Sequence, residues 1–198
     1  MAYTNKGNIQ RHLNVDIATA YDTQIDNWIA AVAAWIDRYC GKTFESGSET
    51  RYYDGNGTRE QKFDDMSSVP TEVKILDSDG TDVATITEGH SNDYLVYPLN
   101  TSPKNTLRLV PSSTVSHFPK RTRSVQITAP FGFSTAIPVD IEQIATTLVS
   151  EIVSVGLKGG KLSSVQLGDY EAAFQKIDEK AGAFRIFQTL DMYRDLEL

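Results

Sequence analysis

The stretch TQIDNWIAAVAAWIDRYCGKTF, residues 23–44, is the most regularly patterned part of the chain. Apolar side chains recur in it every three or four positions, which is typical of one face of an α-helix. Asp22 or Thr23 can cap its start, with Asp26 completing a capping box after Thr23, and Gly41 stands where helices commonly end. The pattern therefore predicts a long amphipathic helix. Its apolar positions are Ile25, Trp28, Ile29, Val32, Trp35, Ile36 and Tyr39.

The second face of this predicted helix is rich in alanine. Small side chains allow another helix or another subunit to approach closely. Packing inside a helical bundle and contact with a neighbouring subunit are both compatible with such a face. We assign Trp28, Ala31 and Trp35 to one or the other of these two roles.

Three further segments show the helical period. The longest is VDIEQIATTLVSEIVSVG, residues 139–156, which follows Pro138 and ends at a glycine. Shorter patterns at residues 4–13 and 181–196 predict one helix near each end of the chain. The two long segments have wide apolar faces, so we expect them to pack on each other.

Residues 44–135 have a different pattern, in which apolar and polar residues alternate between closely spaced turn signals. The DGNG sequence at residues 54–57 separates two β-prone runs and predicts a hairpin. Asp79–Gly80 predicts a second one. DYLVYPL, NTLRLV and SVQITAPF are further strand candidates, separated by prolines.

These patterns predict an α+β fold. We expect a small helical bundle, made of two long helices plus short terminal helices, with an inserted antiparallel β module and an extended C-terminal arm. Residues 1–44 hold the N-terminal helices of the bundle, and residues 45–136 form the inserted β module. Residues 137–156 form the long helix that completes the bundle, and residues 157–198 form the C-terminal arm with its short helix.

The composition excludes several classes of protein. The chain has 198 residues, with 19 basic and 26 acidic groups and a net charge of −7, which is a poor basis for gripping phosphates over the whole surface. The single cysteine, Cys40, excludes an internal disulfide framework and a multi-cysteine zinc site. The longest apolar run, Ile29–Ile36, is far shorter than a membrane span. We expect a soluble protein, assembled in the cytosol.

No catalytic constellation is recognisable in the sequence. The histidines at positions 12, 90 and 117 lack metal-ligand spacing, and GLKGGK does not match a phosphate-binding loop. Cys40 falls at the C-terminal end of the predicted helix, where the helix dipole disfavours a thiolate. We therefore expect neither an enzyme nor a bound cofactor or metal.

Two surface features have both a plain and a functional interpretation. Lys120, Arg121 and Arg123 form the densest basic cluster, which is either a charged loop before a strand or a contact to DNA or an acidic partner. Tyrosines in the strand region either pack across strands or bind carbohydrate. These tyrosines are Tyr52, Tyr53, Tyr94 and Tyr97.

The order of segments resembles the head–tail connector, or adaptor, proteins of long-tailed bacteriophages. The first helix is similar to the family pattern I..WI..A...IE.YTGR.F, and YYDGNGT followed by FDD is similar to its hairpin and acidic strand. LGDYEAAF and LDMYRDL resemble the closing GDYS…LDPYR pattern, with Met192 where proline is usual. The matching closing residues are Gly168, Asp169, Tyr170, Leu190, Asp191, Tyr193 and Arg194.

This resemblance implies a structural role in the virion neck. Such proteins form a ring, generally of twelve copies, beneath the portal protein. The ring extends the channel through which double-stranded DNA passes without sequence recognition, and it receives the stopper or tail-completion protein. The expected location is the neck, after assembly in the host bacterial cytoplasm and without membrane contact. A tail-completion or stopper protein is the close alternative, and a carbohydrate-binding module is the distant one.

The resemblance also implies that the C-terminal segment reaches the portal or a neighbouring subunit. The segment from residue 157 begins with glycines and ends in apolar anchors, which interfaces commonly use. The expected portal-binding residues are Phe184, Phe187, Leu190, Tyr193 and Arg194.

Overall fold

The structure is a computed structural model that describes residues 2–159 and 181–194, without the side chains of residues 156–159 and 181–184. The chain divides into two compact units. A helical unit comprises Met1–Lys42 and Ile137–Leu198, and a β unit comprises Thr43–Ala136.

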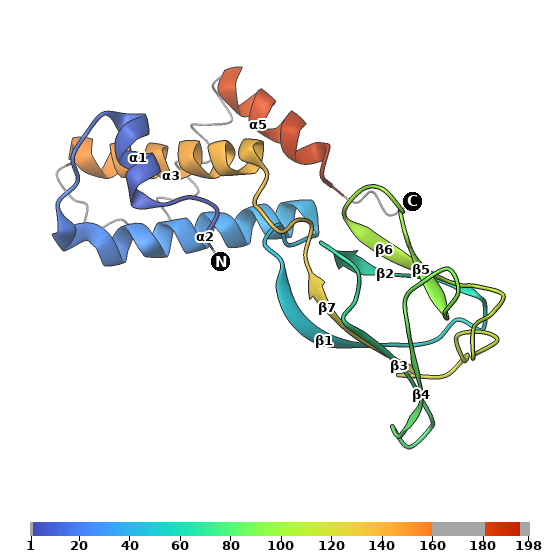
Figure 1. Cartoon of the computed structure of the whole chain (residues 1–198). Helices are drawn as coiled ribbons and strands as arrows, with labels where there is room; N and C mark the ends of the chain where they lie inside the picture. Colours follow the sequence, from blue (N-terminus) through green and yellow to red (C-terminus); the bar gives the residue numbers. More distant parts are fainter. Residues whose placement is uncertain (1, 160–180, 195–198) are drawn as a thin grey trace. The chain divides into compact units, whose positions relative to one another are not determined.

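The helical unit contains four described α-helices and one short 3₁₀ helix. The helix α2 packs on α3, and α1 also packs on α3, as Figure 1 shows. Buried isoleucines and leucines from α2 and α3 fill the space between these helices. The elements are α1 (Lys6–Leu13), η1 (Thr19–Tyr21), α2 (Asp22–Cys40), α3 (Val139–Gly159) and α5 (Ala181–Asp191).

The helix α2 ends as the sequence predicts but begins differently. Gly41 adopts the left-handed conformation with φ of 71°, and its N–H donates to the carbonyl of Asp37. At the other end, Tyr21 precedes the first turn and its side chain makes no capping hydrogen bond. The predicted capping box of Thr23 and Asp26 is therefore wrong, because η1 leads directly into α2.

The β unit is a seven-stranded antiparallel sheet. Its main path runs in the order β4-β3-β7-β2-β6-β5, and β1 pairs with β7 beside this path. The central strand β7 pairs with β1 along its whole length, and with β3 and the end of β2. The strands are β1 (Gly47–Tyr53), β2 (Glu60–Met66), β3 (Glu72–Leu76), β4 (Asp82–Ile86), β5 (Tyr94–Tyr97), β6 (Lys104–Leu109) and β7 (Val125–Phe131).

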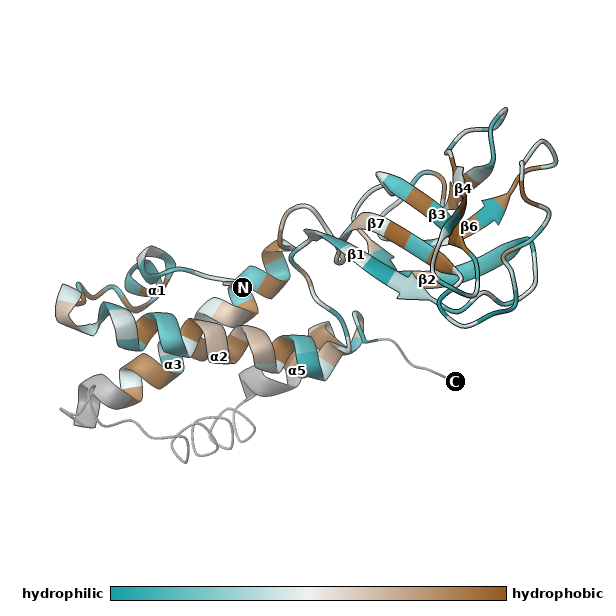
Figure 2. Cartoon of the chain, turned by 90° about the horizontal axis from the view of Figure 1, so that it is seen from below, coloured by the Kyte–Doolittle hydropathy of each residue, from teal (hydrophilic) through white to brown (hydrophobic). Residues whose placement is uncertain are grey.

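The sheet curls around its own core. Hydrophobic and hydrophilic residues alternate along β3 and β7 in Figure 2, and alternate residues of β7 are buried. The edge strands β4 and β5 meet at one end, where Gly89 donates to the carbonyl of Tyr94 at 2.8 Å. The core consists of Phe63, Met66, Val73, Ile75, Ile86, Tyr94, Val96, Leu107, Leu109, Phe118, Val125, Ile127, Ala129 and Phe131.

The predicted fold class, a small helical bundle of two long helices with the strands as an inserted module, is wrong. The curled, seven-stranded antiparallel sheet, an open half-barrel with its own core, is the main element of the described chain. Helical periodicity is a local signal and therefore dominates a sequence, whereas this sheet depends on pairing between distant segments. The partners β1 and β7 are an example.

The two predicted hairpins had different outcomes. The hairpin at Asp79–Gly80 is confirmed, because β3 and β4 pair antiparallel around it. The hairpin at residues 54–57 is wrong, because β1 pairs with β7 and β2 pairs mainly with β6. The DGNG loop instead contacts a distant loop, in which the Arg121 carbonyl accepts from Gly55 N at 3.0 Å. A Cβ at Gly55 would lie 1.9 Å from the carbonyl oxygen of Pro119, so this close approach requires glycine.

Candidate interaction surfaces

The predicted portal-binding residues lie on α5 and just after it, against the helical unit. The ring of Phe187 packs against those of Trp35 and Tyr39, with centroids 6.1 and 5.6 Å away. Leu190 is fully buried, and the carbonyl of this residue faces the Cys40 sulfur at 3.7 Å. These contacts fix α5 on α2 of its own chain.

Two tyrosine–aspartate hydrogen bonds reinforce this contact. Tyr39 of α2 donates to Asp191 of α5 at 2.8 Å, and Tyr193, just after α5, donates to Asp140 of α3 at 2.8 Å. Burial, with the hydrogen bond to Asp140 as the second cause, raises the pKa of Tyr193 to about 12. The hydrogen bond to Asp191, followed by burial, raises the pKa of Tyr39 as well. Both phenols therefore stay protonated donors over the whole neutral range.

The other two predicted portal-binding residues are Arg194 and Phe184. The guanidinium of Arg194 lies 5.6 Å from the ring centre of Tyr39, and this arginine is otherwise exposed. The side chain of Phe184 lies outside the described residues. The structure thus brings Phe187, Leu190, Tyr193 and Arg194 to one end of the helical unit, and their contact with a portal stays a prediction.

The three packing residues predicted on α2 have different environments. Trp28 is fully buried, and its indole N–H has no hydrogen-bond partner among the described residues. Trp35 is half-buried and stacks on Tyr39, whereas Ala31 is exposed. Burial raises the pKa of the neighbouring Cys40 thiol to about 11, so this cysteine is an inert core residue.

The basic cluster lies on the loop before β7, and its three side chains make different contacts. Arg121 donates to the carbonyl of Leu76 at 2.8 Å. Arg123 has a φ of 51°, and its guanidinium lies 4.5 Å from the ring centre of Tyr52. Lys120 is exposed. Arg121 therefore helps to hold the loop, while Lys120 and Arg123 are the members available to a partner.

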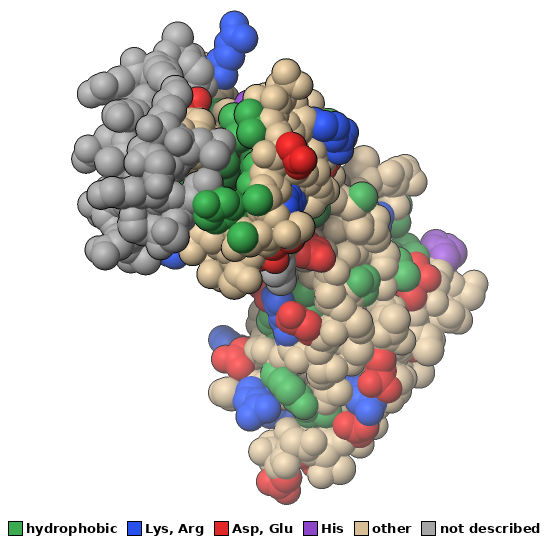
Figure 3. Space-filling view, turned by 90° about the vertical axis from the view of Figure 1, so that its left-hand side faces the viewer, with side chains coloured by type: hydrophobic (Ala, Val, Ile, Leu, Met, Phe, Trp, Pro, Cys, Tyr) green, Lys and Arg blue, Asp and Glu red, His purple; other side chains and the backbone are tan. Residues whose placement is uncertain are grey.

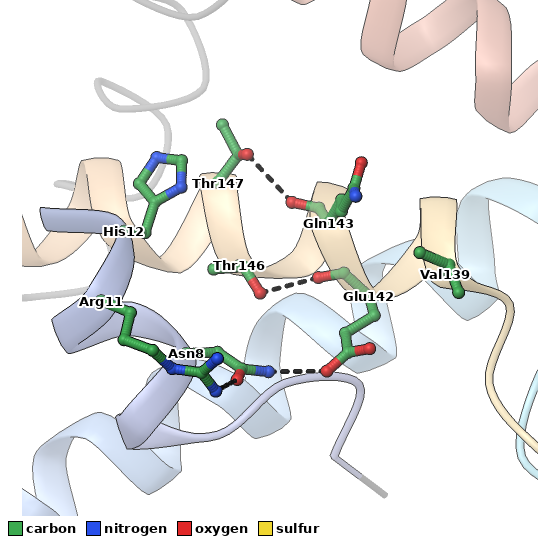
Figure 4. A pocket seen from close by; sticks show the side chains of 8 residues that line it. All are labelled: Asn8, Arg11, His12, Val139, Glu142, Gln143, Thr146 and Thr147. Atoms are coloured by element: carbon green, nitrogen blue, oxygen red, sulfur yellow. Dashed lines mark hydrogen bonds between the residues drawn. The ribbon is translucent and has the colours of Figure 1, made fainter.

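A pocket of about 580 Å³ between α1 and α3 is the feature that sequence reasoning missed (Figure 4). It is polar: Asn8 donates to Glu142 at 2.6 Å, and Thr146 donates to the carbonyl of Glu142 at 2.8 Å. The spacing of Glu142 and Thr146 on one helix face was the only signal in the sequence. The lining residues are Asn8, Arg11, His12, Val139, Glu142, Gln143, Thr146 and Thr147.

The described residues contain no group of histidine, cysteine, aspartate or glutamate side chains arranged to hold a metal ion. In the same part of the chain, no helix combines the length and apolar character of a membrane span. Figure 3 shows one face of the molecule, on which hydrophobic side chains form one larger group and several smaller ones, and charged side chains are scattered. Among the described side chains of the helical unit, the large apolar ones that are exposed are Val15, Val139, Val155 and Met192.

Comparison with known proteins gives likenesses of structure. No family model and no curated protein matches the sequence. A chain in the neck of an empty GTA particle, computed with C6 symmetry, is similar with a TM-score of 0.61 and 15% identity, over 97% of this chain and 89% of that one. A chain in the neck of the native GTA particle, computed with C12 symmetry, gives 0.58 and 16%, over 97% and 88%. A chain in the virion of the native gene transfer agent gives 0.58 and 16%, over 97% and 89%. The chain therefore has the fold of proteins found in the necks and virion of these particles.

Proposed function

We propose that this chain is a structural protein of a virion neck and acts there as the adaptor between the portal and the tail. The observation that carries the proposal is the likeness to chains of two neck structures over 97% of this chain. The order of sequence motifs resembles the adaptor family independently of that likeness. The protein works as a ring component rather than as an enzyme.

The ring contains twelve copies, in line with the C12 symmetry of one similar neck. Closed rings need head-to-tail contacts between unlike surfaces of neighbouring subunits. Double-stranded DNA passes through the ring without sequence recognition. A net charge of −7 suits this role, because a channel that bound phosphates tightly would slow the DNA.

The portal contact uses the C-terminal segment. Of the residues predicted for this contact, Arg194 is exposed and Tyr193 is half-buried, so these two face a portal, whereas Leu190 is fully buried and holds α5 on α2. Met192 is 84% exposed and lies between Leu190 and Tyr193, so the end of α5 offers apolar surface while its buried side remains on α2. The basic residues Lys120 and Arg123 meet the passing DNA or an acidic partner.

The test is a binding experiment with purified portal rings. The chain is mixed with portal alone, and the mass of the complex is measured by sedimentation velocity and imaged for an added layer. A stoichiometric layer on the portal is expected. A chain that ignores the portal but binds tail tubes would instead be a tail-completion protein. A chain that binds neither would refute a neck role.

A variant pair tests the C-terminal contact. Removal of residues 182–198 is expected to abolish portal binding, and Met192→Ala is expected to weaken it without loss of stability. Met192→Ala keeps α5 on α2, so reduced binding by this variant cannot be attributed to unfolding. Unchanged binding by both variants would contradict the assignment.

A further inference from the structure

In the part of the chain that the structure describes, the strand β1 leaves one edge of the sheet unpaired. It pairs with β7 in unbroken register over all seven residues, from Gly47↔Phe131 to Tyr53↔Val125, and it has no second partner strand among the described residues. It contains neither proline nor lysine, and its register has no bulge. Natural edge strands are often blocked by such devices or by charged side chains, because an open edge invites pairing with another chain, and β1 carries only the two charges of Glu49 and Arg51.

The hydrogen bonds of β7 identify which backbone groups face outward. The carbonyls of Ser124, Thr128 and Pro130 accept from Leu76, Thr71 and Ser67, so the even-numbered residues of β7 face β2 and β3. Odd-numbered residues of β7 therefore face β1 and pair there with Gly47, Glu49, Arg51 and Tyr53. The remaining residues of β1 point their N–H and C=O groups away from the sheet. These residues are Ser48, Thr50 and Tyr52.

A contact between two side chains independently supports this division of β1 into residues that face β7 and residues that face the open edge. The hydroxyl oxygens of Thr50 and Thr128 lie 2.9 Å apart. Directly opposite residues come this close when they form the non-hydrogen-bonded type of antiparallel pair, in which the Cα atoms approach to about 4.5 Å. Thr50 therefore directs both of its backbone groups to the open edge.

The sequence of β1 is self-complementary about Thr50. If two copies of β1 pair antiparallel with Thr50 opposite Thr50, then Ser48 lies opposite Tyr52 and all three residues exchange hydrogen bonds. In this register, Glu49 lies opposite Arg51 of the other copy, and Arg51 lies opposite Glu49 of the other copy. Opposite charges directly across two strands stabilise a pair, whereas like charges destabilise it.

The two charged side chains are accessible for this pairing. The side chains of Glu49 and Arg51 are 51% and 38% exposed, and they form an ion pair with each other at 2.8 Å. Arg51 also donates to Asp64 at 2.8 Å. The guanidinium also lies 4.3 Å from the ring centre of Phe131, over the sheet, so it must turn toward the edge to meet a second copy, which would find both charged side chains on one face of β1.

We propose that the open edge of β1 binds the β1 edge of a second copy of this chain, which joins two sheets into one across a two-fold axis at Thr50. In a ring with a single rotation axis, no two-fold axis relates neighbouring subunits, so the ring does not hold this contact between them. The dimer is therefore a state of the free protein that covers the edge outside the ring. The proposal does not depend on the neck function, since its test contains no portal.

The test measures the mass of the purified full chain by sedimentation equilibrium from about 1 µM to about 1 mM, a range that brackets weak association. The wild type is expected to shift from monomer to dimer. Thr50→Pro removes the central outward N–H but no hydrogen bond to β7, so the dimer should be at least about tenfold weaker. Thr50→Val keeps the N–H and the β-branched shape, and it should dimerise like the wild type.

A charge exchange tests the register. Glu49→Arg alone places arginine opposite arginine, and Arg51→Glu alone places glutamate opposite glutamate, so each variant should remain monomeric. Their mixture pairs every arginine with a glutamate and should restore a dimer. Circular dichroism confirms that each variant is folded.

Four outcomes would overturn the proposal. The wild type could stay monomeric throughout, folded Thr50→Pro could dimerise normally, or the charge variants could fail to combine. An assembly larger than a dimer that Thr50→Pro abolishes would also refute it, because the edge would then bind a different surface.

Discussion

At the scale of single residues, Gly55 illustrates what sequence reasoning can and cannot find. A glycine within DGNG indicates a turn, and the chain does turn there. The structural need for glycine is different, because the Pro119 carbonyl oxygen occupies the place of a side chain. That oxygen belongs to a loop more than sixty residues later, so no local pattern contains it.

Gly55→Ala should destabilise the β unit by about 3 kcal/mol, at the upper end of overpacking costs, because backbone atoms rather than a flexible side chain must move. Gly47→Ala is the matched control, since a Cβ there meets no atom within 4 Å. It should change stability by less than about 0.5 kcal/mol. Chemical denaturation of the two variants gives the comparison, and equal effects would argue against the close contact.

Tyr193 supplies a prediction at alkaline pH. Its pKa is raised from 10.0 to about 12 in the folded chain. Because the pKa is higher in the folded than in the unfolded chain, protonated Tyr193 adds to the free energy of unfolding. This contribution is complete below pH 10 and is lost as the pH rises to about 12. Tyr193→Phe cannot ionise, so its stability should fall less than that of the wild type over this window. Thermal unfolding at pH 9 and pH 11.5 measures the difference, and parallel losses in both proteins would contradict it.

At the scale of elements, the sequence predicts best where partners are close in the chain. The helix that ends at Gly41 and the hairpin at Asp79–Gly80 follow from local patterns, and the structure contains both. The pairing of β1 with β7 joins segments almost eighty residues apart. Many antiparallel partners were equally compatible with the alternation in β1, so its real partner was not predictable.

Leu190 is the fully buried side chain among those of α5 that the structure describes. Leu190→Ala should cost about 2–5 kcal/mol of the contact between α5 and α2, as large-to-small changes in cores do. Met192→Ala removes a side chain that is 84% exposed and should leave this contact unchanged. Hydrogen exchange of the α5 amides reports the difference. Equal protection in both variants would show that α5 does not depend on Leu190.

At the scale of the whole molecule, the predicted fold class failed because helical signals outweighed strand signals. The helical segments around Trp28 and Leu148 can be predicted from the apolar periodicity of their own sequence. The sheet becomes visible only when its core residues, such as Phe63, Val96 and Ile127, are brought together from different strands. The candidate surfaces follow the same rule: their residues could be picked from the sequence, whereas their intramolecular contacts could not.

Because the β unit has its own core, residues 43–136 should fold without the rest of the chain. The isolated unit is expected to unfold in one cooperative transition, as small domains do. Urea denaturation followed by far-ultraviolet circular dichroism and by tyrosine fluorescence checks this. Transitions that do not coincide, or no transition, would show that the helical unit is required.

The segments through which the chain enters and leaves the β unit, residues 43–45 and 133–134, are bonded to each other. Phe133 N donates to the carbonyl of Thr43 at 2.9 Å, and Glu45 forms a bridge with Ser134. Recombination at these two adjacent points would exchange the whole unit as a cassette, with no need to remodel the helices that continue on either side.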